Sequence, residues 1–313
     1  MLDDARCNAA FRREVCGAEG WTETPFVCAR AVAVSDENAS YCVTKGDGSY
    51  RCWGEPSMSA ALPTADYVRV QRAEFGLIGL TDDGRLIAPE LALPEDLPAV
   101  VAFRATNMWG NHGVCPRFAD GSFAIIHTQY SEDGTESSLQ IQQTVGPVLS
   151  AGCFFEGLAT AVMADGSIWS MVPEAPPGSD FVDVTMSIGA FCAIQTSGNV
   201  VCFDPYASCT RVSGVRDCVG SELPQFPPGR YHSLTATYDA VCAIDEQGAL
   251  VCRRYDGADM PVAGGPYVFA EAGRDVLCAI RRDGTTACFR QDGLYMMDVT
   301  AFVAVEPPVD VGW

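Results

Sequence analysis

Seven glycine-centred turns recur along the chain, each between two apolar, strand-like runs, and this repeat limits the fold more than any other feature. In four of the seven units the two runs carry cysteines ten residues apart, as in CVTKGDGSYRC and CAIQTSGNVVC. A strand-turn-strand unit that returns every 32 to 50 residues is typical of propellers and solenoids. The turn glycines are Gly48, Gly84, Gly121, Gly166, Gly198, Gly248 and Gly284.

Each unit begins with a further strand-like run, which an aromatic residue opens eleven residues before the first cysteine position. The aromatic residues at this position are Tyr67, Phe181, Tyr231 and Tyr267, with Phe103 and Phe26 as versions displaced by insertions. Alternating apolar and β-branched residues in these runs predict strands. Each unit therefore reads as strand A, a loop, strand B, a tight turn whose glycine supplies a positive φ, and strand C.

We expect an all-β fold, a seven-bladed β-propeller with three- to four-stranded antiparallel blades. Radial closure removes the exposed edges that an open sheet of this length would have. A full fourth strand is not expected after Ser170, because MVPEAPPGSD contains three prolines, which cannot donate to a ladder. The propeller is predicted over residues 26–305, between an N-terminal segment, 1–25, and a tail, 306–313. The run 295–305 or the N-terminal segment is expected to fasten the ring.

Cysteines at equal distances from a hairpin turn lie opposite each other, at a separation that fits a disulfide. Closing a loop of this size contributes on the order of 3 kcal/mol in the chain-entropy model. Zinc is the rival interpretation, but zinc-binding cysteines are usually about two to four residues apart, so no metal site is predicted. An oxidising compartment, and hence secretion, follows from four such pairs. The predicted hairpin disulfides are Cys42–Cys52, Cys192–Cys202, Cys242–Cys252 and Cys278–Cys288.

Seven cysteines remain outside the hairpins. Cys209 and Cys218 are predicted to close the long interval after the fifth unit, and Cys7 and Cys16 to close an N-terminal loop. Cys115 and Cys153 are expected near the same face of two adjacent blades and could form a disulfide between them. Cys28 would then have no partner. An odd cysteine in a secreted chain suggests an intermolecular link or a partner cysteine in a segment that has been removed. A buried free cysteine that packs as a small hydrophobe is the alternative.

The chain carries 40 acidic and 20 basic residues. The resulting negative electrostatic field repels nucleic acid and anionic membranes. We therefore predict no nucleic-acid partner. An acidic surface keeps a secreted protein soluble, and attraction of a cationic partner is the alternative role. No apolar run approaches the length of a membrane span, so no membrane insertion is expected. No basic and apolar leader precedes MLDDARC, so a signal peptide has been removed or was not part of this sequence.

A repeat family is suggested by the phrase YCVTKGDGSYRCWG, by its weaker echoes FCAIQTSGNVVCF, VCAIDEQGALVCR and LCAIRRDGTTACF, and by the aromatic strand before each. These segments, over residues 26 to about 290, resemble the regulator of chromosome condensation repeat family, most closely its extracellular, disulfide-bearing bacterial branch. Only the first repeat keeps Cys52, Trp53 and Gly54, and the Gly-Gln-Leu-Gly that usually follows is absent. The resemblance implies a seven-bladed propeller, secreted or at the cell surface, in the bacterial extracellular space or periplasm. Family members range from nucleotide-exchange factors to a secreted β-lactamase inhibitor, so the resemblance does not choose a function.

The sequence offers no evident catalytic machinery. Its three histidines, His112, His127 and His232, lie at unrelated positions of the repeat. No nucleophile elbow, His-Glu-x-x-His motif or phosphate-binding glycine loop occurs, and carboxylates are too numerous to single any out. We therefore predict no catalytic residue, no cofactor and no enzyme activity.

Ligand binding is expected at the loop-rich face, which holds the loops between strands A and B and the segments that leave strand C. The longest intervals, 127–147 and 205–230, belong to this face. Recognition usually resides in variable loops on a rigid frame, and exposed aromatic residues supply anchors. In the alternative interpretation, Trp109 and Phe155 fold back over blade edges. The predicted binding residues are Asn107, Met108, Trp109, Tyr130, Phe154, Phe155, Tyr206 and Phe226.

Two functions follow from these patterns. The preferred one is a secreted, non-catalytic recognition module that binds an unknown protein or glycan through the loop-rich face. The alternative is a structural or assembly subunit of a cell-surface or extracellular fibre. Such a subunit would join its neighbours through residues 1–25, through the tail 306–313 or through Cys28.

Overall fold

In the computed structural model, the described residues form β-strands and connecting segments and contain no helix, so none of them lies in a helix long enough to span a membrane. They fall into two compact units, a first unit from residues 1–100 and 263–313 and a second unit from residues 101–262. The described residues are 5–7, 12–17, 20–27, 29–34, 41–53, 62–73, 76–91, 93–108, 111–130, 136–153, 159–171, 178–186, 190–203, 210–212, 215–217, 223–237, 240–254, 258–262, 264–273, 276–292 and 295–298.

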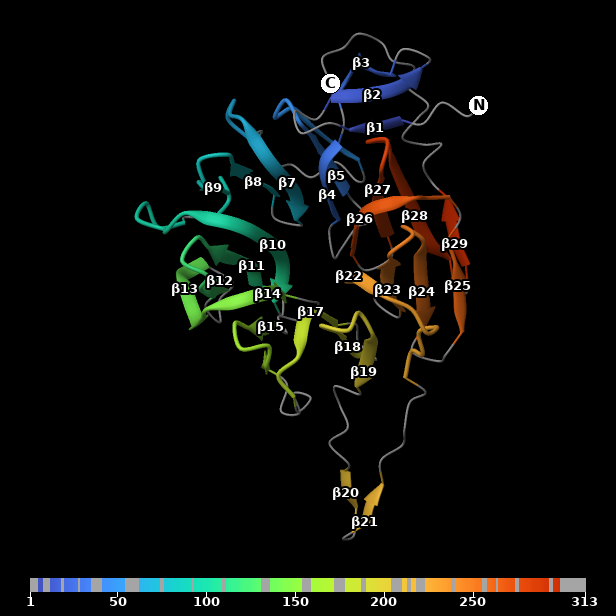
Figure 1. The fold of residues 1–313 in the computed structure, drawn as a ribbon. Helices are drawn as coiled ribbons and strands as arrows, with labels where there is room; N and C mark the ends of the chain where they lie inside the picture. The colour runs from blue at the N-terminus through green and yellow to red at the C-terminus, as the bar shows by residue number, and fades with distance from the viewer. Residues whose placement is uncertain are drawn as a thin grey trace. The chain divides into compact units, whose positions relative to one another are not determined.

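Seven of the nine described sheets correspond to the seven sequence repeats, and we call them blades 1 to 7 (Figure 1). Each consists of three or four strands in chain order, as predicted. In the first unit, blade 1 contains β4 (Ala29–Val34), β5 (Tyr41–Lys45) and β6 (Tyr50–Trp53); blade 2 contains β7 (Tyr67–Ala73), β8 (Gly76–Thr81) and β9 (Leu86–Ile87); and blade 7 contains β26 (Tyr267–Ala272), β27 (Val276–Arg281), β28 (Thr286–Asp292) and β29 (Tyr295–Asp298).

The second unit holds the other four blades. Blade 3 contains β10 (Val100–Met108), β11 (Asn111–Phe118), β12 (Phe123–Tyr130) and β13 (Glu136–Val145); blade 4 contains β14 (Val148–Cys153), β15 (Ala159–Met163) and β16 (Ile168–Ser170); blade 5 contains β17 (Phe181–Met186), β18 (Phe191–Gln195) and β19 (Val200–Phe203); and blade 6 contains β22 (Tyr231–Ala236), β23 (Ala240–Asp245), β24 (Leu250–Arg254) and β25 (Asp259–Pro261).

Two small sheets lie outside the repeats. One consists of β1 (Ala5–Cys7), β2 (Arg12–Gly17) and β3 (Gly20–Val27), and the other is the hairpin of β20 (Thr210–Val212) and β21 (Val215–Asp217). In the N-terminal sheet, the backbone register places Cys7 opposite Arg13 and Cys16 opposite Trp21. The predicted Cys7–Cys16 bridge therefore does not join directly opposed positions. Cys28, Cys209 and Cys218 lie outside the described residues.

The turn glycines adopt the conformation that the repeat predicts. All seven have φ between 80° and 88°, a left-handed region that residues with a side chain rarely enter. Five of the seven also approach another segment closely: Gly48, Gly84, Gly121, Gly166 and Gly198. A Cβ added to Gly198 would lie 3.0 Å from the Cα atom of Arg230, and one added to Gly48 would lie 3.0 Å from the Cα atom of Asp66. These five turns therefore need glycine both for φ and for space.

This close approach allows a main-chain hydrogen bond between successive blades. Within the second unit, the N–H groups of Val148, Phe181 and Tyr231 donate to the carbonyl oxygens of the preceding turn glycines at 2.8, 3.1 and 2.9 Å. In the first unit, Ala29 N–H donates to Gly284 O at 3.1 Å and so joins blade 1 to blade 7. The same bond therefore links neighbours in sequence and the first blade to the last.

The contact between blades 1 and 7 is described in part, and residues 299–305 of the run expected to fasten the ring lie outside the described residues. Strand β29, the described part of the run 295–305, pairs with β28 as the outer strand of blade 7. Blades 1 and 7 meet through the Gly284 bond and a shared core cluster that includes Val32, Val34, Val276 and Ile280. Among the described residues, no strand of one blade is inserted into the sheet of the other.

Two aromatic assignments are also wrong. Phe26 belongs to β3. The equivalent residue of blade 1 is Ala29, whose N–H makes the hydrogen bond to a turn glycine. In β10 the equivalent bond, to Gly84 O at 2.8 Å, comes from Val100 and not from Phe103. The first residue of a blade must donate a main-chain hydrogen bond, but it need not be aromatic. A search for aromatic residues therefore placed the start of blades 1 and 3 at the wrong residues.

Five disulfides connect the described strands. The four predicted hairpin disulfides are confirmed, each between directly opposed residues with Cα atoms 4.0 or 4.1 Å apart. The fifth joins Cys115 of β11 to Cys153 at the end of β14, with Cα atoms 6.1 Å apart, and so bridges blades 3 and 4 as expected. Covalent links therefore hold individual hairpins and one pair of blades.

A carboxylate ties together the first strands of blades 4, 5 and 6. Asp183 of β17 accepts hydrogen bonds from Ser150 Oγ at 2.7 Å, from the N–H of Val184 at 2.9 Å and from the N–H of Leu234 at 3.0 Å. Part of the residue is exposed, but desolvation of the carboxylate raises the pKa of Asp183, and the three hydrogen bonds offset only part of that shift. The group serves the packing of blades at the cost of burying a charge.

The first unit contains a comparable tie between the first strands of blades 2, 1 and 7. The guanidinium of Arg69 in β7 donates to both carboxylate oxygens of Glu271 in β26, at 2.6 and 2.5 Å. Gln71 of β7 donates to the carbonyl oxygen of Val34 in β4 at 3.0 Å. Both units therefore use polar side chains of strand A to fix one blade against the next.

The substitution Gly198→Ala tests the turn contact. We expect it to lower the free energy of unfolding by on the order of 2 kcal/mol, because φ is +88° and the new Cβ would lie 2.9 Å from Arg230 Cβ. The matched control is Gly229→Ala, whose Cβ would have no neighbour closer than 3.6 Å and should cost less than about 0.5 kcal/mol. Urea denaturation without reductant measures both, and equal losses would contradict the role of the turn.

The substitution Asp183→Asn tests the buried carboxylate. Because the folded-state pKa is raised, the folded protein binds a proton that the unfolded chain has released. Wild-type stability should therefore fall as the pH rises from about 4, the unfolded value, through the folded pKa. Asn does not titrate, so the difference in unfolding free energy between wild type and variant should shrink along the same pH range. If the unfolding free energies of wild type and variant run parallel between pH 4 and 8, the pKa of Asp183 is not raised.

Candidate functional site

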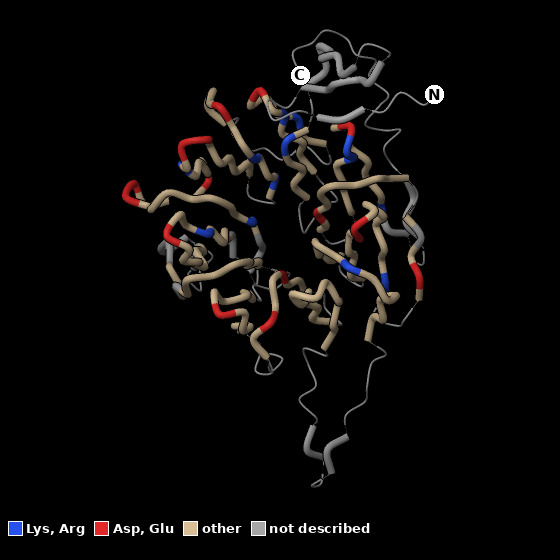
Figure 2. Tube along the Cα trace, viewed as in Figure 1, with Lys and Arg blue, Asp and Glu red and all other residues tan. Residues whose placement is uncertain are grey.

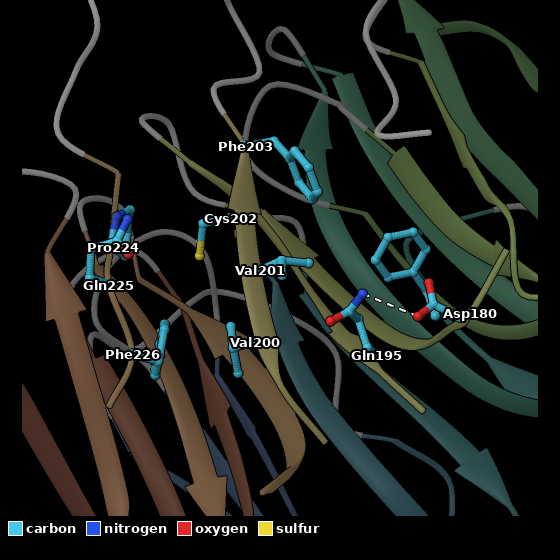
Figure 3. A pocket seen from close by; sticks show the side chains of 10 residues that line it. Asp180, Gln195, Val200, Val201, Cys202, Phe203, Pro224, Gln225 and Phe226 are labelled. Carbon is cyan, nitrogen blue, oxygen red and sulfur yellow. Dashed lines mark hydrogen bonds between the residues drawn. The ribbon is translucent and has the colours of Figure 1, made fainter. Parts of the chain in front are cut away.

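A cleft of about 420 Å³ lies beside β19 in the second unit (Figure 3). All four residues of the strand, Val200, Val201, Cys202 and Phe203, line it. Successive side chains of a strand point to opposite faces of the sheet, so four consecutive residues can line one cleft only if it follows the edge of the strand. The cleft therefore runs along the outer edge of blade 5, opposite the edge that pairs with β18.

The two faces of β19 pack against different core clusters. Val200 and Cys202 contact the cluster that contains Leu234 and Tyr231 of blade 6, on the side where Phe226 lies. Val201 and Phe203 contact the cluster of Phe181 and other residues of blades 4 and 5. Figure 3 shows Val200 directed toward Phe226 and Val201 directed toward the opposite side. The cleft thus has an apolar wall on each face of the strand.

The hairpin disulfide determines which main-chain groups of β19 point into the cleft. In antiparallel pairs, opposed residues about 5.5 Å apart exchange two main-chain hydrogen bonds, and those about 4.5 Å apart exchange none. The Cα atoms of Cys192 and Cys202 are 4.1 Å apart, so this pair is of the second kind. The N–H and C=O of Cys202, and those of Val200 two residues earlier, therefore point away from β18 and into the cleft.

Asp180 and Gln195 form a polar side of the cleft. Gln195 Nε2 donates a hydrogen bond to Asp180 Oδ2 at 3.1 Å (Figure 3), and the carbonyl oxygen of Asp180 accepts one from Thr196 N–H at 2.7 Å. Asp180 is exposed, and the chain has a net charge of −20. This rim therefore presents a negative charge that is accessible to a ligand.

Phe226 is positioned by the segment that leads into β22. Its ring meets the ring of Tyr231 edge-on, with centroids 5.6 Å apart. The hydroxyl of Tyr231 donates to the carbonyl oxygen of Pro227 at 3.1 Å, and burial raises the pKa of Tyr231, which keeps this hydroxyl protonated. Phe226 is only partly buried, so it can contact a ligand from a well-anchored position.

The structure places the predicted binding residues unevenly. Phe226 lies in the cleft. Asn107 and Met108 end β10, and Tyr130 ends β12, so the antiparallel order of blade 3 brings them to the same end of that sheet. The structure does not bring them together with Phe226 in the described cleft. The predicted binding residues outside the described part of the chain are Trp109, Phe154, Phe155 and Tyr206.

Sequence reasoning missed the edge of β19, together with Asp180 and Gln195. The sequence did contain a signal for this edge. In a disulfide-linked hairpin, the position of the second cysteine determines which N–H and C=O groups of the outer strand point away from the hairpin. What the sequence did not show is that no described strand of the chain pairs with this edge.

Potential metal ligands and the histidines are dispersed in the described part of the chain. There, no group of three or more His, Cys, Asp and Glu side chains is placed to hold a metal ion. Of the histidines, His112 lies in β11, His127 in β12 and His232 in β22. The buried carboxylate nearest the cleft in sequence, Asp183, already accepts three hydrogen bonds from the protein.

No protein-family model and no curated protein matches the chain. Solved structures do resemble it. The CRINKLY WD40 ectodomain of the Arabidopsis thaliana receptor kinase ACR4 aligns with a TM-score of 0.58 and 14% identity, over 85% of this chain and 100% of that one. Hsv2 from Kluyvelomyces marxianus gives a TM-score of 0.55 at 7% identity, over 88% of this chain and 98% of its own.

A third structure, the β-propeller domain of Cps50 (Swd1) from Myceliophteria thermophila, has a TM-score of 0.55 at 10% identity, over 84% of this chain and 96% of its own. At such identities the likeness concerns the fold alone, and it does not confirm the regulator of chromosome condensation repeat family. Together with the seven repeat sheets, it establishes the fold class: this chain is an all-β, seven-bladed β-propeller with three- to four-stranded antiparallel blades.

Proposed function

We propose that this protein is an extracellular, non-catalytic recognition module that binds another protein through the cleft beside β19. The cleft itself carries the proposal, because it combines an open strand edge, apolar walls and a negative rim. Its volume of about 420 Å³ is in the range of ligand-binding sites. Phe203 and Phe226 supply aromatic surface of the kind that anchors protein interfaces.

The disulfides support the extracellular location. Five disulfides among the described residues are stable in an oxidising compartment and rare in the cytosol. The ACR4 structure, which shares the fold, is that of a receptor kinase ectodomain. A β-propeller of this fold therefore occurs in an extracellular domain of another protein.

A protein target is preferred to a glycan because the cleft follows a strand edge. Main-chain N–H and C=O groups at such an edge match those of an extended peptide segment. The alternative function, a fibre subunit that assembles through residues 1–25, the tail 306–313 or Cys28, has no comparable support, and the tail and Cys28 lie outside the described residues.

The substitution Phe226→Ala tests the recognition function. The wild-type protein is immobilised with its disulfides intact and exposed to the extracellular fraction of its source, and retained proteins are quantified by mass spectrometry. We expect wild type to retain at least one protein, and the variant to retain it about tenfold less, because an aromatic anchor is lost. Retention that is equal for both, or absent for wild type, would contradict the proposal.

Two further variants separate binding from folding. Gln225→Arg places a bulky side chain at an exposed position of the cleft and should also reduce retention without removing a core contact. Val268→Ala removes a side chain that is 47% exposed in blade 7 and should leave retention unchanged. Thermal unfolding of all three variants shows whether each one remains folded at the assay temperature.

A further inference from the structure

We infer that the outer edge of β19 is a strand-addition site, at which an extended segment of the partner protein binds antiparallel to β19 as a fourth strand of blade 5. The inference rests on the proposed function and adds the mode of binding and the chemistry of the bound segment. In this mode main-chain hydrogen bonds supply affinity, and the alternate side chains supply specificity.

Other blades of this chain already carry a strand in the corresponding position. The fourth strands β13, β25 and β29 pair with the third strands of blades 3, 6 and 7. Within the described residues, blade 5 ends at β19, and its edge opens into the cleft. The repeat therefore accommodates an added strand at this edge, and in blade 5 no described strand occupies that position.

Blade 6 shows how an added strand meets the second cysteine of a hairpin. Cys252, which is equivalent to Cys202, lies opposite Met260 of β25. Two residues further on, Arg254 N–H donates outward to Ala258 O at 3.0 Å, as expected if Cys252 also points its main-chain groups outward. In blade 5, Val200 and Cys202 present the same groups to the cleft, so a bound segment can pair with both.

The faces of the strand define the side chains of the bound segment. Directly opposed residues of antiparallel strands project to the same face, so the guest residue opposite Cys202 points to the side of Val200 and Phe226. It is apolar, as is Met260, which is only 1% exposed. The guest residues on either side point to the face of Val201 and Asp180, where the exposed carboxylate and the net charge of −20 favour Lys or Arg.

The bound segment is therefore a strand of alternating apolar and basic residues. A labelled peptide, acetyl-Lys-Val-Arg-Met-Lys-Val-Arg-amide, provides the probe, and its binding to the disulfide-intact protein is followed by fluorescence anisotropy. We expect saturable binding that weakens about tenfold in the Phe226→Ala variant and is unchanged in Val268→Ala.

N-methylation distinguishes strand addition from simple attraction between a basic peptide and an acidic protein. The amide of the central methionine faces β19 in the inferred register, whereas the amide of the following lysine faces away. Methylation of the methionine amide should weaken binding at least about tenfold, and methylation of the lysine amide by less than about twofold. Equal effects of the two methyl groups, or no binding of the unmodified peptide, would overturn the inference.

Hydrogen exchange tests whether the edge is open in the free protein. The amides of Cys202 and Cys252 occupy the same repeat position, but only that of Cys252 faces a described fourth strand. By NMR we expect fast exchange at Cys202, slow exchange at Cys252, and protection of Cys202 when the peptide binds. Slow exchange at Cys202 in the free protein would mean that another part of the chain or a second copy covers the edge. Light scattering separates these two cases, and either refutes the inference.

The two proposals fail in different ways. If wild type retains a protein in a Phe226-dependent manner but the methylated peptides bind alike, the strand-addition mode is wrong and the recognition function stands. If the methionine-methylated peptide alone loses binding while no protein is retained from the extracellular fraction, the edge site stands and the proposed function is wrong for that fraction.

Discussion

The main-chain hydrogen bond from the first residue of a blade to the turn glycine of its neighbour is the interaction on which the structure depends. It needs a positive φ and the absence of a Cβ, because the neighbouring backbone lies about 3 Å from where that atom would be. Both partners are main-chain groups, so neither restricts the side chains of the intervening segment. Units as different as 32 and 50 residues can therefore share one packing geometry.

The sequence predicted those parts of the fold in which one residue type has one physical role. Glycine marked the turns and paired cysteines marked opposed positions, so the seven units and four hairpin disulfides were predictable. The first strand position was misplaced at Ala29 and Val100, because a backbone donor leaves no signature in the side chain. Phe226 was recognisable as an aromatic residue in a long interval. The edge of β19 is defined by the lack of a described strand beside it, and a sequence does not show which strand edges stay unpaired.

Acidic residues recur at the turns of the described strands. Figure 2 shows acidic positions at many of the turns between strands. Asp120 and Asp165 each accept hydrogen bonds from the N–H and hydroxyl of a serine two residues later, and these bonds lower the pKa of both carboxyls. Such carboxylates stabilise their own turns as Asx motifs and need no bound cation. Asp180 differs, because its carboxylate lies beside a cleft and is engaged by a single amide side chain.

An open strand edge is normally a hazard, since it offers a template for aggregation. In blade 5 the hazard is contained by the brevity of β19, which has four residues, and by the segment Pro224–Gln225–Phe226 along one side of the cleft. The Cys192–Cys202 disulfide holds the strand against β18 and so fixes the direction of its outward N–H and C=O groups. A rigid edge loses little conformational freedom when a partner binds, and this preorganisation increases affinity. The same covalent bond that secures the hairpin thereby prepares its outer edge for recognition.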